Sequence, residues 1–316
     1  MKLQPGEDAP DGRRWLWPRA PATARFIYAG ELTGEGNFES ASGAEPGRAT
    51  RALRWLVGLN QRRPDPVILQ RPQGGTVDRR GRVFVTDVSR AATFVFDPNA
   101  GRLDVWERAT SSANFVAPIG VAMGPAGDLL VSDAELGIVA RLSPTGEPIG
   151  EIGRGLLQRP TGIARDSRRQ RIYVADTHAN DIKVFDDDGS LVDLISHEGD
   201  GPGALNSPTY LAVSNGLLYV VDTLNSRIQI FDAEGDLLKA FGERGLYSGN
   251  LARPKGVAVG PEGNIYVVES YHDHLLAFDP DGRLLLPIGG NRPRAGPVLP
   301  SGRCLDRRRR ARLRRR

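Results

Sequence analysis

The sequence predicts an all-β protein, a β-propeller with five complete four-stranded blades and an incomplete sixth. A strand-like segment that ends in a carboxylate recurs five times, at spacings of 46, 43, 46 and 47 residues. Each unit opens with a proline and contains short runs rich in Val, Ile, Tyr and Phe, separated by turns with glycine. One such sheet cannot bury both of its faces alone, so the copies must stack around a common axis.

The elements of each unit follow in a fixed order. An inner strand begins at a proline, in turn Pro72, Pro118, Pro160, Pro208 and Pro254. A second strand ends in the repeat carboxylate, in turn Asp87, Asp133, Asp176, Asp222 and Glu269. A third strand carries an apolar residue nine positions later, in turn Phe96, Leu142, Phe185, Phe231 and Phe278. A glycine turn and an outer strand complete each antiparallel unit.

The fourth unit, SPTYLAVSNGLLYVVDTLNSRIQIFDAEGDLLKAFG, resembles the NHL repeat. The resemblance covers residues 71 to 290, and the units lack the Gly-His and Trp-Asp signals of WD40 blades. It implies a bacterial-type NHL propeller, a fold that usually closes with six blades. Relatives of this fold bind proteins, bind RNA or, in some cases, catalyse reactions, so the resemblance specifies the fold more closely than the function.

Both ends of the chain bear on the sixth blade. We expect residues 1–23 to be a surface segment, 24–302 the propeller domain and 303–316 a disordered Arg-rich tail. Residues 24–38 look like an outer strand with its linker, and Pro300 opens a repeat on schedule, after which the strand pattern stops. We therefore expect a truncated or frameshifted C-terminal repeat; an evolved basic arm is the alternative. A short helix is expected near 48–58.

Composition excludes several classes of protein. Residues 291–316 contain eleven Arg and one Asp, a net charge of +10, so the other 290 residues carry 4 − 10 = −6. The longest apolar run is five residues, too short for a membrane span, and a single cysteine, Cys304, excludes an internal disulfide. The N-terminus has no signal peptide as read, which places the protein in the cytoplasm, or in the periplasm or outside the cell if the start codon is misassigned.

The five repeat carboxylates have a structural and a catalytic interpretation. Acidic residues at strand ends accept backbone N–H bonds in the following turn, and one such role per blade explains five copies. A metal or active site needs only one or two of them. We therefore predict no catalytic residue, no metal site and no cofactor.

Because strand directions alternate, the turns between second and third strands lie on the same face as the start of the inner strands. We expect this face to bind the partner, through Arg90, Glu135, His178, Tyr210, Leu224, Tyr271 and His272. His272 and His274 form a His-x-His pair that could also hold a metal.

The sequence therefore favours a non-catalytic scaffold that binds a protein or peptide, with no nucleic-acid partner. A metal-dependent hydrolase similar to lactonases, or a lyase similar to amidating lyases, is the enzymatic alternative. Nucleic-acid binding through the Arg-rich tail is the other alternative.

Overall fold

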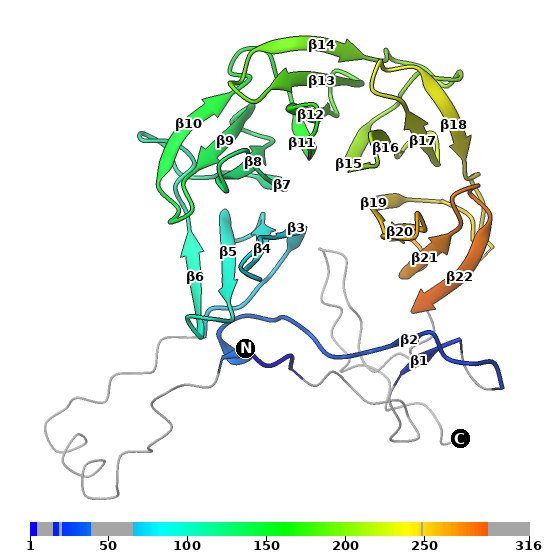
Figure 1. Cartoon of the computed structure of the whole chain (residues 1–316), viewed down its shortest axis with the longest axis horizontal. Coiled ribbons are helices and arrows are strands. Elements are labelled where there is room, and N and C mark those ends of the chain that lie inside the picture. Colours follow the sequence, from blue (N-terminus) through cyan, green and yellow to red (C-terminus); the bar gives the residue numbers. More distant parts are fainter. Residues whose placement is uncertain (5–14, 19–20, 39–65, 248, 290–316) are drawn as a thin grey trace, which may run out of the picture.

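The repeated strand pattern folds into five four-stranded antiparallel sheets, one for each repeat. The computed structural model describes residues 1–4, 15–18, 21–38, 66–247 and 249–289. Within these ranges the protein is an all-β propeller with five blades, which confirms the predicted fold class (Figure 1). The consecutive strands of each blade are hydrogen-bonded in chain order from the inner strand outwards.

The strand bounds match the predicted order in every blade. The inner strands are β3 (Pro72–Val77), β7 (Pro118–Met123), β11 (Pro160–Asp166), β15 (Pro208–Ser214) and β19 (Pro254–Val259). The second strands are β4 (Val83–Asp87), β8 (Leu129–Asp133), β12 (Arg171–Asp176), β16 (Leu217–Asp222) and β20 (Ile265–Glu269). The third strands are β5 (Ala92–Asp97), β9 (Ile138–Leu142), β13 (Asp181–Asp186), β17 (Arg227–Phe231) and β21 (His274–Phe278). The outer strands are β6 (Arg102–Trp106), β10 (Pro148–Ile152), β14 (Leu191–Ile195), β18 (Leu237–Phe241) and β22 (Leu284–Gly289).

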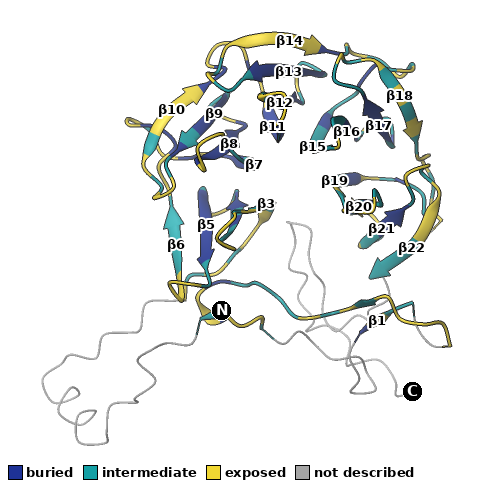
Figure 2. Ribbon diagram, viewed as in Figure 1, coloured by how far each residue is buried: buried dark blue, intermediate teal, exposed yellow. Residues whose placement is uncertain are grey.

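Apolar side chains between consecutive blades form the core. Between the second and third blades, for example, Leu130, Val174 and Phe185 belong to one fully buried cluster. Figure 2 shows the consequence, because burial is greatest in the second and third strands while the outer strands are mostly half-buried or exposed. Each blade therefore covers the apolar face of the next, as the repeat predicts.

The five blades form an arc with β3 at one end and β19 at the other (Figure 1). The N-terminal segment runs between these ends. Phe26 makes an edge-to-face contact with Tyr266 of the fifth blade, with ring centroids 6.3 Å apart. Phe38 stacks on Phe96 of the first blade at the same centroid distance. This segment thus joins the last blade to the first.

The N-terminal segment differs from the expected outer strand of a sixth blade. Its strand β2 (Phe26–Ile27) pairs only with β1 (Leu16–Trp17), and a short 3-10 helix, η1 (Glu35–Asn37), follows. The sixth sector therefore contains no four-stranded sheet within the described residues.

Three predictions fall on residues outside the described ranges: the helix near 48–58, the repeat opening at Pro300 and the Arg-rich tail at 303–316. None of the helices in the described ranges has the length and apolar composition of a membrane span.

Candidate functional site

Each repeat carboxylate is buried at the end of its second strand and holds the loop that leads into the inner strand of its own blade. In the first blade, Asp87 Oδ2 accepts the backbone N–H of Gln70 at 2.6 Å and of Arg71 at 2.9 Å. In the fifth, Glu269 Oε1 accepts the N–H of Arg253 at 2.7 Å. The donor lies one or two residues before the opening proline, which itself has no N–H to offer.

The same carboxylates also hold the turn that follows them. Asp133 Oδ1 accepts the N–H of Glu135 at 3.1 Å and of Leu136 at 3.0 Å. Glu269 accepts the N–H of Tyr271 at 3.2 Å and of His272 at 2.7 Å. In these blades one buried carboxylate thus fixes two loops. We call the face formed by such loops the mouth face; it consists of the turns between second and third strands and the residues flanking each opening proline.

Two blades use side-chain donors from the turn or from the third strand instead. Asp222 Oδ2 accepts bonds from Asn225 Nδ2 at 2.8 Å, Arg227 Nε at 2.8 Å and Gln229 Nε2 at 3.1 Å. Lys183 Nζ lies 3.0 Å from Asp176 Oδ2. In both blades the carboxylate still accepts a backbone N–H from the loop before the proline.

These bonds control the ionisation of the carboxylates. Burial raises the pKa of Glu269, but hydrogen bonds from the N–H groups of His272, Arg253 and Tyr271 outweigh burial and hold that pKa below its ordinary value. Burial likewise raises the pKa of Asp176, and its backbone and lysine donors again bring the pKa below the ordinary value. Both groups are therefore stabilised as anions that serve as acceptors.

The six turn residues predicted for partner binding lie in the turns of the mouth face, one from each of blades one to four and two from the fifth. Leu224 and Tyr271 are 55% and 62% exposed, large values for an apolar and an aromatic side chain. Glu135 forms an exposed ion pair with Arg159 at 3.3 Å. Arg90 Nε donates to the Ile68 carbonyl oxygen at 3.2 Å, and His178 is exposed.

The His-x-His pair is not arranged as a pair of free ligands. His272 Nδ1 lies 2.7 Å from Glu269 Oε2, and its Nε2 lies 3.1 Å from the Leu246 carbonyl oxygen. Both ring nitrogens of His272 are thus engaged by neighbouring acceptors. The ring of His274 lies 6.2 Å away, and its buried Nδ1 has no hydrogen-bond partner among the described residues. Among the described residues, no three His, Cys, Asp or Glu side chains are grouped as metal ligands would be.

Tyr210, the seventh predicted residue, lies in the inner strand β15 and packs against the apolar cluster between the fourth and fifth blades. Burial raises the pKa of its hydroxyl to about 12. A side chain at Gly162 would approach the Tyr210 Cα within 2.6 Å, so the two inner strands are in close contact. Tyr210 therefore contributes more to packing than to the exposed surface of the mouth face.

Sequence reasoning missed a set of cations on the mouth face. The residue before the opening proline is arginine in three of the five repeats, as Arg71, Arg159 and Arg253, and Lys255 follows Pro254. Arg159 is paired with Glu135, whereas the side chains of Arg71, Arg253 and Lys255 form no ion pair or hydrogen bond with any described residue. The recurrence of arginine before the proline was the available signal.

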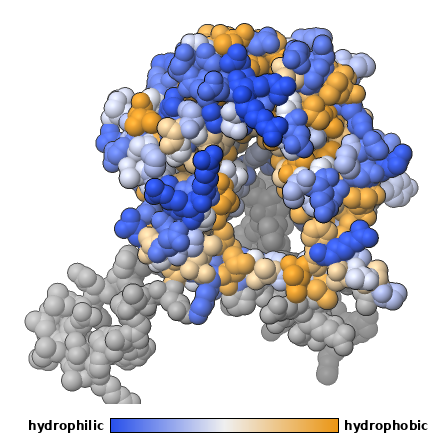
Figure 3. All heavy atoms as spheres, in the orientation of Figure 1, coloured by the Kyte–Doolittle hydropathy of each residue, from blue (hydrophilic) through white to orange (hydrophobic). Residues whose placement is uncertain are grey.

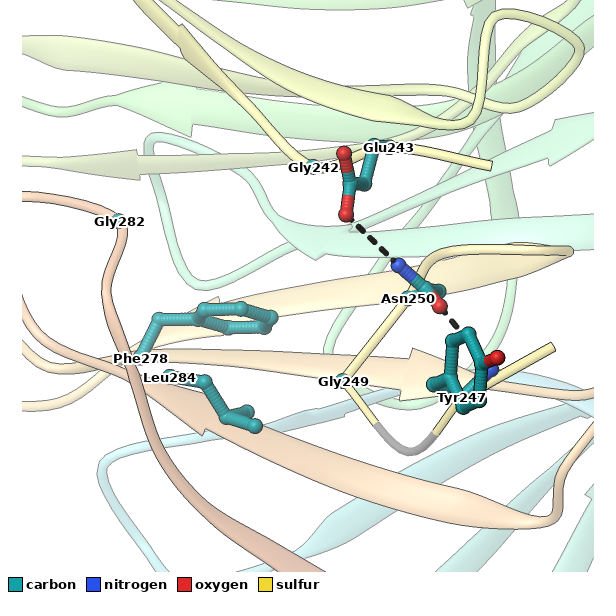
Figure 4. Close-up of a pocket in the computed structure, with 8 residues that line it drawn as sticks. All are labelled: Gly242, Glu243, Tyr247, Gly249, Asn250, Phe278, Gly282 and Leu284. Carbon is teal, nitrogen blue, oxygen red and sulfur yellow. Dashed lines mark hydrogen bonds between the residues drawn. The ribbon is translucent and has the colours of Figure 1, made fainter. Parts of the chain in front are cut away.

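Figure 3 shows apolar residues along the inner sides of the blades. A cavity of about 460 Å³ lies at the outer edge, lined by Gly242, Glu243, Tyr247, Gly249, Asn250, Phe278, Gly282 and Leu284. In Figure 4, Glu243 and Asn250 are joined by a hydrogen bond of 3.1 Å above the Phe278 ring.

Comparisons with known proteins agree with this architecture. The NHL repeat family matches residues 205–231, which span most of the fourth blade. No curated protein has a matching sequence.

Three solved structures share the fold. A streptogramin B lyase is 19% identical, with 70% of each chain covered and a TM-score of 0.56. Nidogen, from a nidogen/laminin complex, is 18% identical over 71% of this chain and 84% of that chain, with a TM-score of 0.59. A gluconolactonase from Xanthomonas campestris is 20% identical over 63% and 69%, with a TM-score of 0.51. At these identities the similarity concerns the fold alone. By its five four-stranded blades the chain is a β-propeller, and its fourth blade contains a match to the NHL repeat.

Proposed function

We propose that this protein is a non-catalytic scaffold that binds a protein or peptide through the mouth face. The observation that carries the proposal is the exposure of Leu224 and Tyr271 on turns that buried carboxylates hold, through Asn225 Nδ2 in the first case and the N–H of Tyr271 in the second. Both turns come from adjacent blades, the fourth and the fifth. The mouth face thus presents apolar and aromatic anchors from a rigid frame.

Rigid presentation favours binding for a definite reason. Association costs the ordering of side chains and loops, and loops that are already fixed reduce that cost. A few residues supply most of the binding energy in protein interfaces, and tyrosine is enriched among them. An exposed leucine beside the tyrosine adds apolar area that binding removes from water. The turn residues Arg90, Glu135, His178 and His272 would form the polar rim, where charges contribute more to specificity than to affinity.

The nidogen structure supports a binding role at the level of the fold. That propeller was solved in a complex with laminin, so a protein of this architecture is found bound to another protein.

A peptide-display experiment tests the proposal. Random peptides would be selected on the whole protein and then assayed against the double variant Leu224→Ala/Tyr271→Ala. We expect at least a tenfold loss of affinity, because two exposed anchors are removed. Leu194→Ala is the matched control, because Leu194 is 51% exposed but lies on an outer strand. Selected peptides that bind the double variant and the wild type equally would refute the proposal.

One observation favours the enzymatic alternative: the solved structures with this fold include a lyase and a gluconolactonase. Metal analysis of the purified protein separates the two functions. The engagement of both His272 nitrogens leads us to expect the same metal content in the wild type and in His272→Ala. A stoichiometric divalent metal that is lost in His272→Ala would favour the enzyme.

A further inference from the structure

We propose that Arg71, Arg253 and Lys255 form an anion site on the mouth face, between the fifth and first blades, that receives the carboxylate of an acidic peptide. This inference rests on the proposed function and names the chemistry of the partner.

The topology of the ring places the three cations at the starts of the two inner strands that end the arc. Arg71 precedes the inner strand β3, while Arg253 and Lys255 flank the opening proline of β19. These two strands are the ends of the arc, on either side of its centre (Figure 1). The backbone N–H groups of Arg71 and Arg253 are fixed by Asp87 and Glu269, at 2.9 and 2.7 Å. Both arginines therefore project from anchored backbone.

Lys255 occupies a position that holds a smaller, uncharged residue in the third and fourth blades. The equivalent positions of the third and fourth blades hold threonines that bond locally, Thr161 to Thr177 at 2.7 Å and Thr209 to Thr223 at 2.6 Å. Lys255 is half-buried in that place and has no partner among the described residues. Burial, and then the positive charges of Arg253 and Arg71, lower the pKa of Lys255. An unpaired, partly buried cation beside two others is unfavourable unless a ligand compensates it.

Two acidic side chains, Glu269 and Asp87, bond to the backbone of Arg253 and Arg71, and both already accept several hydrogen bonds. Glu269 already accepts four bonds from its own blade, from Arg253, Tyr271 and both the backbone and ring of His272. Asp87 accepts four backbone N–H bonds. Among the described residues no carboxylate bonds to the three side chains, and we infer that an external anion is their partner. Guanidinium groups bind carboxylates in a planar, two-bonded arrangement.

The charge of the whole molecule favours a short acidic peptide over a nucleic acid. Residues 1–290 carry a net charge of 4 − 10 = −6, so a long polyanion would be repelled away from the three cations. The exposed ring of Tyr271 follows Glu269 by two residues and offers an apolar contact beside the site. A glutamate or aspartate next to an apolar residue fits both features.

The test uses two labelled pools of ten-residue peptides with amidated C-termini. One pool has two central glutamates, the other has two central glutamines, and the remaining positions are random. Fluorescence anisotropy with the whole protein should show binding of the glutamate pool at least tenfold tighter than the glutamine pool. Lys255→Met should lower the affinity for the glutamate pool about tenfold. Adding Arg71→Gln and Arg253→Gln should abolish the preference for the glutamate pool over the glutamine pool, because each change removes a charged hydrogen bond.

Two controls keep the outcome interpretable. Arg168→Gln removes an exposed arginine from the turn between β11 and β12, at the other end of the strands, and should leave binding unchanged. Lys255→Met should melt no lower than the wild type, which separates loss of the site from loss of the fold. The inference would be overturned if the two pools bound equally or if neither bound. It would also be overturned if Arg168→Gln weakened binding as much as Lys255→Met.

Further outcomes separate this inference from the proposed function. Tighter binding of a ten-nucleotide RNA than of the glutamate pool, dependent on the same three cations, would overturn it in favour of a nucleic-acid site. Display-selected peptides that need Leu224 and Tyr271 but contain no acidic residue would overturn it while the proposed function stands.

Discussion

A buried carboxylate that accepts several hydrogen bonds is the central residue of each blade. Asp133 shows this most simply, because backbone N–H groups of the loop before Pro118 and of the following turn bond to its two oxygens. An amide at this position would offer one acceptor oxygen and place an NH₂ group against N–H donors. The residue type is therefore dictated by the donors around it.

We predict that Asp133→Asn destabilises the protein by about 2–4 kcal/mol, because buried N–H groups lose their acceptor. Urea denaturation followed by circular dichroism measures this change. Asp236→Asn is the control, because Asp236 is exposed in a turn, and it should change stability by less than about 0.5 kcal/mol. Equal effects of the two substitutions would contradict the structural role of Asp133.

The lowered pKa values of Glu269 and Asp176 predict an acid limit on stability. A carboxyl whose pKa is lower in the folded state stabilises the fold above its unfolded-state pKa, and this contribution is lost as pH falls through the folded-state pKa. The free energy of unfolding should therefore decline below about pH 4.5, the ordinary value for glutamate. Urea titrations between pH 7 and pH 3 measure the decline. Glu269→Gln should make it shallower, and an unchanged slope would refute the assignment.

At the scale of the blade, close approach of inner strands decides which residues are allowed. In the first three blades, the glycine two residues after the opening proline lies against the next inner strand. A Cβ on Gly120 would lie 2.2 Å from the Thr161 carbonyl oxygen and 2.9 Å from Ser132 Oγ. Ser132 in turn donates to the same Thr161 oxygen, and Thr86 donates to the Ile119 oxygen at 2.6 Å. These contacts hold neighbouring blades at a fixed spacing.

We predict that Gly120→Ala destabilises the protein by about 1–3 kcal/mol, because the new methyl group must displace backbone of the third blade. Gly150→Ala is the matched control, since Gly150 is also in a strand of the second blade but a Cβ there meets nothing within 4 Å. Thermal melting of both variants measures the difference. A melting temperature for Gly120→Ala equal to that of Gly150→Ala would show that the blades are farther apart than described.

At the scale of the whole molecule, the two ends of the arc are covered unequally. The apolar face of the first blade is packed against Leu32, Phe38 and neighbouring residues. On the outward face of the fifth blade, Val268 is 47% exposed, whereas its equivalents Thr86, Ser132, Ala175 and Val221 are fully buried. The fifth blade thus presents apolar surface towards the sixth sector.

A matched pair of substitutions tests this exposure. Val268→Lys should change stability by less than about 1 kcal/mol, because the lysine can reach water. Val221→Lys should cost more than about 4 kcal/mol or prevent folding, because it buries an unpaired charge. Chemical denaturation and soluble yield compare the two. If Val268→Lys lost as much stability as Val221→Lys, the face of the fifth blade would be covered in solution.

The sequence by itself determined the five blades, the strand order and the turns. These features depend on short-range periodicity, and the Asn215-Gly216 turn shows why: both residues have positive φ, which that residue pair adopts readily between strands. It also placed the predicted partner residues in the correct turns, but it did not reveal that Tyr210 is packed or that His272 is engaged.

Only the tertiary structure decided which groups meet. The repeat carboxylates bond to N–H groups that lie 16 to 18 residues away, on a loop whose position depends on strand pairing. Arg71 and Lys255 are 255 − 71 = 184 residues apart, and the curvature of the blades around an axis places them at the two ends of one arc. Periodicity specifies a blade, whereas the contacts between distant blades depend on the curvature of the whole ring.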